Sequence, residues 1–244
     1  MPEIFLLGSG IRGTLQFSTE TLQAIRACRK VFILHDDLKI HAFIRDLCPA
    51  VVDAGQFYTD DGPRRSVYEA ISEALIEEAL VDPPVGFLVH GHPLFLVSAT
   101  ELILEGAALR GLSTSVIPAI SSFDTLLCDL SLDFGYALQI FDATTLIRES
   151  IELNPYVPTL IFQIATVLND NVARGDISAQ AVEPLTTYLL RFYPENHVCE
   201  VVYSGTDLIE AAVRTKAELG QITAFPNLSL WKRPTLFVPA VRRS

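Results

Sequence analysis

The chain has 244 residues, half of them hydrophobic, with 18 Lys and Arg against 29 Asp and Glu. Its net charge of −11 disfavours a surface that binds the phosphate backbone of nucleic acids. The apolar runs are broken by Gly, Pro, Asp or Arg before they reach the roughly 18 residues of a membrane span, and the N-terminus lacks the basic start of a secretion signal. We therefore expect a cytoplasmic protein with a large core, no nucleic-acid or membrane partner, and two domains.

The first half of the chain alternates short apolar runs with helical patterns, which predicts an α/β domain with a parallel sheet. The expected strands are 4–7, 30–34, 85–89 and 114–117. Ser18 with Thr21 suits the start of the first helix, and a second helix is expected over 98–110. The glycines at 8, 10 and 13 are separated from that first helix by a long loop, which disfavours a dinucleotide fingerprint.

A further helix is expected near Pro63, with Asp61 or Gly62 as N-cap and Pro63 as the first helical residue. Its apolar stripe is predicted to be Val67, Ala70, Ile71, Ala74, Leu75 and Ala79. Arg64 and Arg65 place cations in the first turn, where the helix dipole favours anions, so we expect something to compensate them. Arg64 and Tyr68 share one helix face, which fits either a paired functional site or a surface arginine packed over a tyrosine ring.

The strand 85–89 ends in the turn His90-Gly91-His92-Pro93. The carboxyl ends of parallel strands are where open α/β sheets bind ligands, so this turn either approaches a ligand or is a plain connection. Two histidines with no third ligand nearby do not indicate a metal site. The four cysteines are isolated in the sequence and are interpreted as reduced core thiols.

The second half continues the α/β pattern, and we place the domain boundary between residues 117 and 118, giving domains 1–117 and 118–244. Strands are expected over 136–141, 159–165, 198–203 and 236–239, and helices over 143–151, 183–192 and 207–219. Gly220 suits the end of the last helix.

Three blocks together resemble the tetrapyrrole-methylase-like, class III S-adenosylmethionine (SAM) methyltransferases: Leu6–Ile11, the turn His90–Pro93, and Pro118–Ser122. The resemblance implies two α/β domains of the tetrapyrrole methylase type with the cofactor cleft between them. Gly91-His92-Pro93 in place of the usual Gly-Asp-Pro, and the block Phe57–Tyr68, resemble the borosin α-N-methyltransferases. That family methylates backbone amides of a ribosomally made precursor peptide.

The resemblance implies three catalytic residues, Tyr58, Arg64 and Tyr68. It also implies contacts to SAM from His90, His92, Phe95, Ser122, Gln163, Tyr203, Ser204 and Thr235. The chain departs from the borosin pattern at His90, where a tyrosine is expected, and at Gly55, where another aromatic is expected. Because the sequence stops soon after the last expected strand, we expect the split type, acting on a separate precursor peptide, and by resemblance a homodimer.

The residue types suit this chemistry. An amide nitrogen becomes nucleophilic only when its proton is lost and charge builds on the amide oxygen. A cationic Arg64 near a phenol is expected to lower the pKa of that phenol from its ordinary value of about 10, while the other phenol holds the oxyanion. Which tyrosine has which role stays open. The alternatives are a tetrapyrrole C-methyltransferase, for which this acidic chain offers few cations, and a SAM-binding partner protein without turnover.

Overall fold

The computed structural model describes the chain except residues 60, 134, 136, 225–227, 230–232 and 243–244. Tyr136, where one strand was expected to begin, lies outside the described residues. Two compact units are defined by their internal contacts, Met1–Thr125 with Thr206–Glu210, and Leu126–Gly205 with Ala211–Ser244. The expected division between residues 117 and 118 stays a prediction. In the described part of the chain, no helix is both long enough and apolar enough to cross a bilayer.

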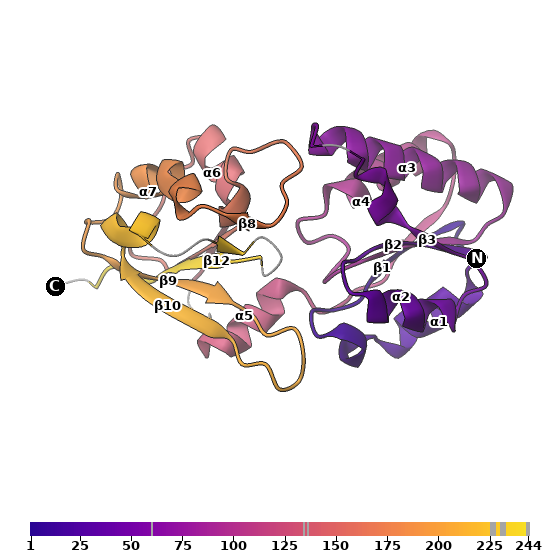
Figure 1. Cartoon of the computed structure of the whole chain (residues 1–244), viewed down its shortest axis with the longest axis horizontal. Helices are drawn as coiled ribbons and strands as arrows, with labels where there is room; N and C mark the ends of the chain where they lie inside the picture. The colour runs from indigo at the N-terminus through magenta and orange to yellow at the C-terminus, as the bar shows by residue number, and fades with distance from the viewer. Residues whose placement is uncertain (60, 134, 136, 225–227, 230–232, 243–244) are drawn as a thin grey trace. The chain divides into compact units, whose positions relative to one another are not determined.

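The first unit is built on a fully parallel five-stranded sheet of order β3-β2-β4-β1-β5. Its strands are β1 (Ile4–Gly8), β2 (Lys30–Leu34), β3 (Val51–Asp53), β4 (Val85–Val89) and β5 (Thr114–Val116). Its helices are η1 (Gly13–Gln16), α1 (Thr19–Ala27), α2 (Leu38–Arg45), η2 (Ala54–Phe57), α3 (Arg64–Val81) and α4 (Ser98–Leu109). Helices α3 and α4 cover one face of this sheet and α1 and α2 the other (Figure 1).

Burial explains why the apolar segments of the first unit form strands. All five residues of β4 are buried, as expected of a central strand covered on both faces. Strands β2 and β4 have the bounds that the sequence predicted, and Ser18 caps α1 by accepting a hydrogen bond from the Thr21 amide, as expected. The main core on one side of the sheet includes Leu7, Ile25, Ile33, Ile44 and Leu88.

Helix α3 differs from the prediction at its start. It begins at Arg64, with Pro63 in the N-cap position and no side-chain cap, because the ψ of Pro63 is 126°, outside the helical range. The buried stripe consists of Val67, Ile71, Ser72, Leu75, Ile76 and Ala79. Ala70 is exposed instead of buried.

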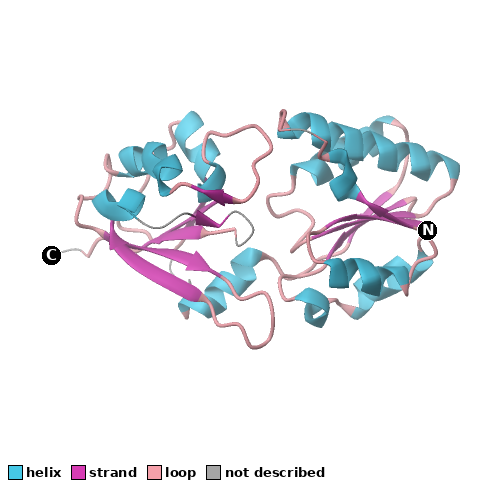
Figure 2. Cartoon of the chain, viewed as in Figure 1, coloured by secondary structure: helices cyan, strands magenta, loops and turns pink. Residues whose placement is uncertain are grey.

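The second unit has a mixed sheet of order β10-β9-β12-β7-β6, in which only the β6–β7 pair is parallel. Its strands are β6 (Gln139–Asp142), β7 (Thr159–Phe162), β9 (Val198–Tyr203), β10 (Val213–Glu218) and β12 (Thr235–Val238), with β8 (Asp176–Ile177) and β11 (Leu228–Ser229) in a separate pair. The helices are α5 (Ser122–Leu130), α6 (Ala143–Arg148), η3 (Ile164–Thr166), η4 (Ala179–Val182), α7 (Glu183–Leu189) and η5 (Leu219–Ala224). The division between the two units falls within α5. Figure 2 shows which parts of the chain are helix, strand and loop.

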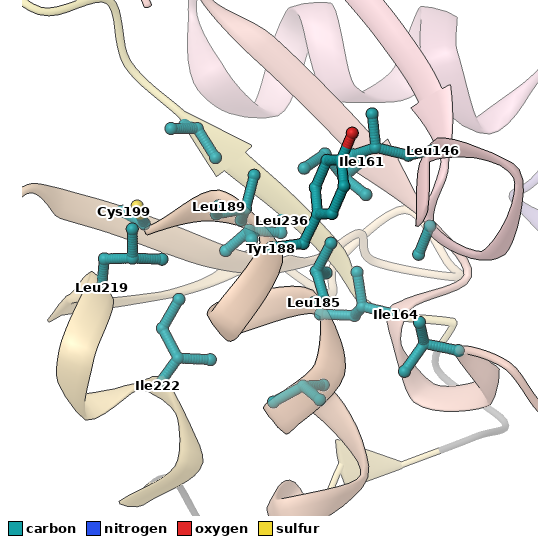
Figure 3. Packing of buried hydrophobic residues seen from close by; sticks show 14 of the residues in the cluster. Leu146, Ile161, Ile164, Leu185, Tyr188, Leu189, Cys199, Leu219, Ile222 and Leu236 are labelled. Atoms are coloured by element: carbon teal, nitrogen blue, oxygen red, sulfur yellow. The ribbon is translucent and has the colours of Figure 1, made fainter. Parts of the chain in front are cut away.

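The core of this unit lies between its sheet and α7. Leu185 and Leu189 of α7 pack with Ile161 of β7 and Leu236 of β12 (Figure 3). The Tyr188 hydroxyl, also on α7, donates a 2.7 Å hydrogen bond to the carbonyl of Ile151, so a buried polar group is satisfied.

Two predictions for this half were wrong. The helix expected over 207–219 is absent: residues 213–218 form β10, an antiparallel neighbour of β9. Strand pairing along six residues outweighs the weak helical pattern there. The exposed Cys128 also differs from the expected core thiol, whereas Cys28, Cys48 and Cys199 are buried as expected.

Candidate functional site

Three loops meet at the carboxyl edge of the first sheet. Gly10, after β1, and Gly91, after β4, form a bridge in which the Gly91 amide donates to the Gly10 carbonyl at 2.9 Å. Both residues have positive φ, 73° and 77°, which glycine adopts without strain. A Cβ on Gly8 would lie 2.6 Å from the Cβ of Ala119 and would collide with the carbonyl oxygen of Gly91. The loops therefore approach closely because residue 8 has no side chain.

The third loop, Pro118–Ser122, is held to the first turn of α5. Asp124 accepts hydrogen bonds from the amide and the hydroxyl of Ser121, at 2.7 and 2.6 Å. Burial acts to raise the pKa of the Asp124 carboxyl, but these hydrogen bonds and the electrostatic effect of nearby His92 outweigh it and leave that pKa below its ordinary value. His92 and the 118–122 loop, two predicted cofactor positions, are thus neighbours.

An open cavity of about 470 Å³ lies beside this loop. Its lining residues are Leu15, Gln16, Phe17, Ser18, Pro118, Ala119, Ile120 and Asp124. Apolar walls around a single carboxylate suit a ligand with a flat apolar part and a positive charge. In the loop after β4, Phe95 is half-buried, and Leu96 has a φ of 60°, a strained conformation of the kind found at ligand-binding sites.

The three predicted catalytic residues lie close together. Tyr58 follows η2, while Arg64 and Tyr68 project from the first turns of α3, and all three are half-buried. Burial, the electrostatic effect of Tyr68, a side-chain hydrogen bond with Tyr68 and the charge of Asp36 raise the pKa of Tyr58, and Arg64 only partly opposes them. Arg64 thus acts in the expected direction on Tyr58, but the other effects are larger, so Tyr58 is not the phenol whose pKa falls overall.

The two arginines at the start of α3 have different environments. The Nε of Arg65 lies 2.8 Å from the Glu69 carboxylate, an i,i+4 ion pair that compensates this cation as the sequence required. Arg64 instead acts electrostatically on Tyr58. Arg64 is half-buried, and the alternative of an arginine packed over the ring of Tyr68 stays open.

The sequence reasoning missed His35 and Asp36. The Nδ1 of His90 lies 3.2 Å from the Nε2 of His35, and the two rings stack edge to face with centroids 5.0 Å apart. Leu34 and Val89 are paired in adjacent parallel strands, so the residues that follow them meet at the sheet edge. The signal available in the sequence was a polar run, His35-Asp36-Asp37, directly after an apolar strand.

The other predicted cofactor contacts belong to the second unit. Tyr203 ends β9, Thr235 begins β12, and Gln163 follows β7, so the strand register places the three at one edge of that sheet. Gln163 has a φ of 57°, another strained non-glycine residue. The Ser204 hydroxyl donates a 2.5 Å hydrogen bond to Asp129, and the Thr235 side chain is only 3% exposed. Asp129 was not anticipated from the sequence.

Solved structures share this fold. The chain superposes on a diphthine synthase with a TM-score of 0.68, at 18% identity, covering 97% of this chain and 89% of that one. A uroporphyrin-III-C-methyltransferase from Thermus thermophilus gives 0.64 at 16% identity, covering 97% and 91%. These likenesses show that the fold is of the expected tetrapyrrole methylase type.

Curated relatives carry names that combine a methyltransferase with a peptide precursor. A type I borosin cyclic peptide precursor from Serendipita vermifera subsp. bescii is 26% identical over 240 residues, 96% of this chain and 58% of the relative. The lentinulin A precursor of Lentinula edodes is 28% identical over 163 residues, 66% of this chain and 39% of the relative. A type III borosin precursor from Anomoporia bombycina is 26% identical over 166 residues, 68% and 19%. The chain thus spans between a fifth and three fifths of the length of these relatives.

The sequence model of the tetrapyrrole (corrin/porphyrin) methylases matches residues 3–218, across both compact units. The match includes the glycine loop after β1, the turn after β4 and the 118–122 loop. The chain therefore belongs to the tetrapyrrole (corrin/porphyrin) methylase family.

Proposed function

We propose that the chain is a SAM-dependent methyltransferase that methylates backbone amide nitrogens of a separate, ribosomally made precursor peptide. The observation that carries the proposal is the convergence of Tyr58, Arg64 and Tyr68 at the carboxyl edge of the first sheet. Two phenols and a guanidinium are suited to a substrate that must lose an N–H proton while its oxygen gains negative charge. The names of the curated relatives, which join methyltransferase and peptide precursor, point to the same substrate class.

The first unit contains features that fit SAM. Its cavity offers Phe17 and Ile120 to a purine and the Asp124 carboxylate to a cation. His90, His92, Phe95 and Ser122 lie on the adjoining loops after β4 and before α5. SAM supplies an activated methyl group and leaves as S-adenosylhomocysteine, so the protein provides orientation and proton transfer. The contacts of Gln163, Tyr203, Ser204 and Thr235 with SAM are part of this proposal.

The environments of the two tyrosines suggest different roles. Burial and the side-chain hydrogen bond with Tyr68 raise the pKa of Tyr58. A phenol with a raised pKa keeps its proton, which suits Tyr58 to donate a hydrogen bond to the amide oxygen. We assign Tyr68 as the base that accepts the amide proton, Tyr58 as the phenol that donates to the amide oxygen, and Arg64 as the cation that stabilises the charge on both.

The direct test supplies the peptide in trans. Purified chain is incubated with SAM and with a synthetic candidate precursor peptide, and tandem mass spectrometry locates each added methyl group. Methylation on backbone nitrogens of the separate peptide supports the proposal. Calorimetry with SAM and S-adenosylhomocysteine on the same protein measures cofactor binding independently of the peptide.

Other outcomes would identify the competing functions. Cofactor binding with no transfer to any peptide, but with transfer to carbon atoms of a tetrapyrrole supplied in parallel, would assign a tetrapyrrole C-methyltransferase. Binding with no transfer to either acceptor would favour a partner protein without turnover. The absence of measurable binding of either cofactor form would contradict the enzyme proposal as a whole.

A further inference from the structure

Three of the five histidines form a chain of contacts beside the catalytic tyrosines. The amide of Asp37 donates a 3.0 Å hydrogen bond to the Nδ1 of His35, and the Nε2 of His35 contacts the Nδ1 of His90 at 3.2 Å. His41, 2% exposed, donates from its Nε2 to the carbonyl oxygen of His35 at 2.7 Å. The ring of His35 is therefore held by its own turn, and the backbone carbonyl of His35 is held by the helix that follows.

These contacts determine where the protons are. A backbone amide can only donate, so the Nδ1 of His35 carries no proton, and neutral His35 is protonated at Nε2. That proton is donated to His90, so the Nδ1 of His90 accepts and its own proton is at Nε2. Adding a proton to the Nδ1 of His90 would bring two N–H groups face to face. The tautomer of His90 is thus set by a hydrogen bond to a neighbouring strand.

The turn that carries His35 is itself firmly built. Asp37 caps α2, accepting a 2.8 Å hydrogen bond from the Lys39 amide. The intervening Asp36 acts electrostatically on the Tyr58 phenol, which places this turn next to the catalytic trio. The histidine pair and the tyrosines therefore share one edge of the first sheet, with His35 directly after β2 and His90 directly after β4.

We infer that His35 is a positioning residue for methyl transfer, which fixes His90 as the tautomer with its proton at Nε2. The inference rests on the proposed function and deepens it, because it names the group that orients a predicted cofactor-contacting side chain. His90 then has a single ring donor of defined position. Loss of the His35 donor removes the hydrogen bond that keeps the Nδ1 of His90 unprotonated, so the proton of His90 can exchange between the two nitrogens.

Two substitutions separate the two hydrogen bonds of His35. In His35→Asn the amide oxygen occupies the place of Nδ1 and still accepts from Asp37, but no group reaches His90. In His35→Gln the terminal NH₂ occupies the place of Nε2 and still donates to His90, while the bond from Asp37 is lost. His197→Gln is the matched control, since His197 donates from its Nε2 to the Pro239 carbonyl, at 2.8 Å, in the second unit.

Imidazole ¹⁵N shifts from long-range ¹H–¹⁵N NMR report the tautomer of each histidine without any substrate. We expect His90 to be protonated at Nε2 in the parent, in His35→Gln and in His197→Gln, and to show averaged nitrogens in His35→Asn. Methylation by His35→Asn is expected to fall about tenfold in kcat, the scale of one hydrogen bond, with little change in KM, and His35→Gln to restore most of the rate.

Each contrary result has a distinct meaning. If His90 is protonated at Nδ1 in the parent, or if His35→Asn changes neither its nitrogen shifts nor kcat, the inference is overturned. If both His35 variants lose the same activity while His90 keeps its tautomer, His35 is only structural and the inference is also overturned. If the parent methylates no peptide, the proposed function fails, while the nitrogen shifts still decide whether His35 fixes His90.

Discussion

Gly8 and Gly91 touch so closely across β1 and β4 that a methyl group on residue 8 would overlap the carbonyl oxygen of residue 91. The same methyl group would press on Ala119 and on the ring of Pro93, 3.0 Å from its Cδ. The carbonyl is backbone and cannot turn aside. The absence of a side chain at residue 8 therefore allows the loops that carry the predicted cofactor residues to approach one another.

We therefore predict that Gly8→Ala destabilises the protein by about 1–3 kcal/mol through overpacking. Gly111→Ala is the control, because Gly111 also has a positive φ, 70°, but has nothing within 4 Å of an added Cβ. It is expected to lose only about 1–2 kcal/mol from backbone strain. Urea unfolding gives both free energies, and calorimetry is expected to show weaker SAM binding for Gly8→Ala alone. A Gly8→Ala protein with parental stability and affinity would contradict the packing described.

Tyr68→Phe removes one hydroxyl and keeps the ring. If Tyr68 accepts the amide proton, the methylation rate is expected to fall about 10²–10³-fold, with cofactor affinity little changed. Single-turnover kinetics with saturating SAM measure the rate. Tyr156→Phe, at a tyrosine 51% exposed in the second unit, is expected to retain the parental rate. Equal rates for Tyr68→Phe and the parent would exclude the assigned mechanism.

Arg64→Lys keeps the charge but loses the planar fork that can face two oxygens at once. We expect a fall of about tenfold or more in the methylation rate, the cost of at least one charge-assisted hydrogen bond. The neighbouring arginine provides the control: Arg65→Lys keeps an exposed i,i+4 pair with Glu69 and is expected to be neutral. Methylation rates of the two variants are measured in parallel. A similar fall in rate in both variants would indicate an effect on α3 as a whole.

Two buried thiols predict the response of stability to alkali. Burial raises the pKa of both Cys28 and Cys199 from 9.0 to about 12, with a smaller contribution from Cys48 at Cys28. A pKa raised on folding stabilises the native state below the unfolded value, so this stability is expected to be lost as pH rises from about 9 towards 12. Urea unfolding across that range measures how the free energy of unfolding falls with pH. We expect it to fall less steeply for Cys199→Val than for the parent, and as steeply as in the parent for Cys128→Val, since Cys128 is exposed. The same dependence of the free energy of unfolding on pH in the parent and in both variants would contradict this account.

The resemblance also predicts a homodimer. Sedimentation equilibrium over a wide concentration range is expected to give twice the 26.9 kDa chain mass. Because an extended peptide requires a long groove, activity is expected to fall together with the dimer fraction on dilution. A monomer that keeps its specific activity would refute this prediction.

The sequence predicted those elements that are determined by their own residues, and it missed those that depend on pairing with a distant segment. The strands at 30–34, 85–89 and 198–203 were found because most of their residues are apolar, and short runs that are mainly apolar indicate burial. The segment 213–218 was misassigned because its strand is created by pairing with β9, a tertiary interaction that local periodicity does not record. The second sheet's antiparallel pairings were likewise not visible in any single segment.

The candidate site shows the same contrast between local and distant determinants. Tyr58, Arg64 and Tyr68 are close in sequence, so motif spacing and helix geometry predicted their proximity. His35 and His90 are 55 residues apart and meet only because β2 and β4 are neighbours in register. The raised pKa of Tyr58 depends first on burial and also on Asp36, which the block does not contain, as well as on Tyr68, which it does.

The anchoring of α3 has a thermodynamic consequence for catalysis. Val67, Ile71 and Leu75 fix the helix in the core, so the backbone under Arg64 and Tyr68 is ordered before any ligand arrives. The conformational entropy of that segment is lost when the chain folds and is not lost again when the peptide binds. Binding energy from the peptide is then available to orient the amide itself, and the ordering cost on encounter falls mainly on the substrate.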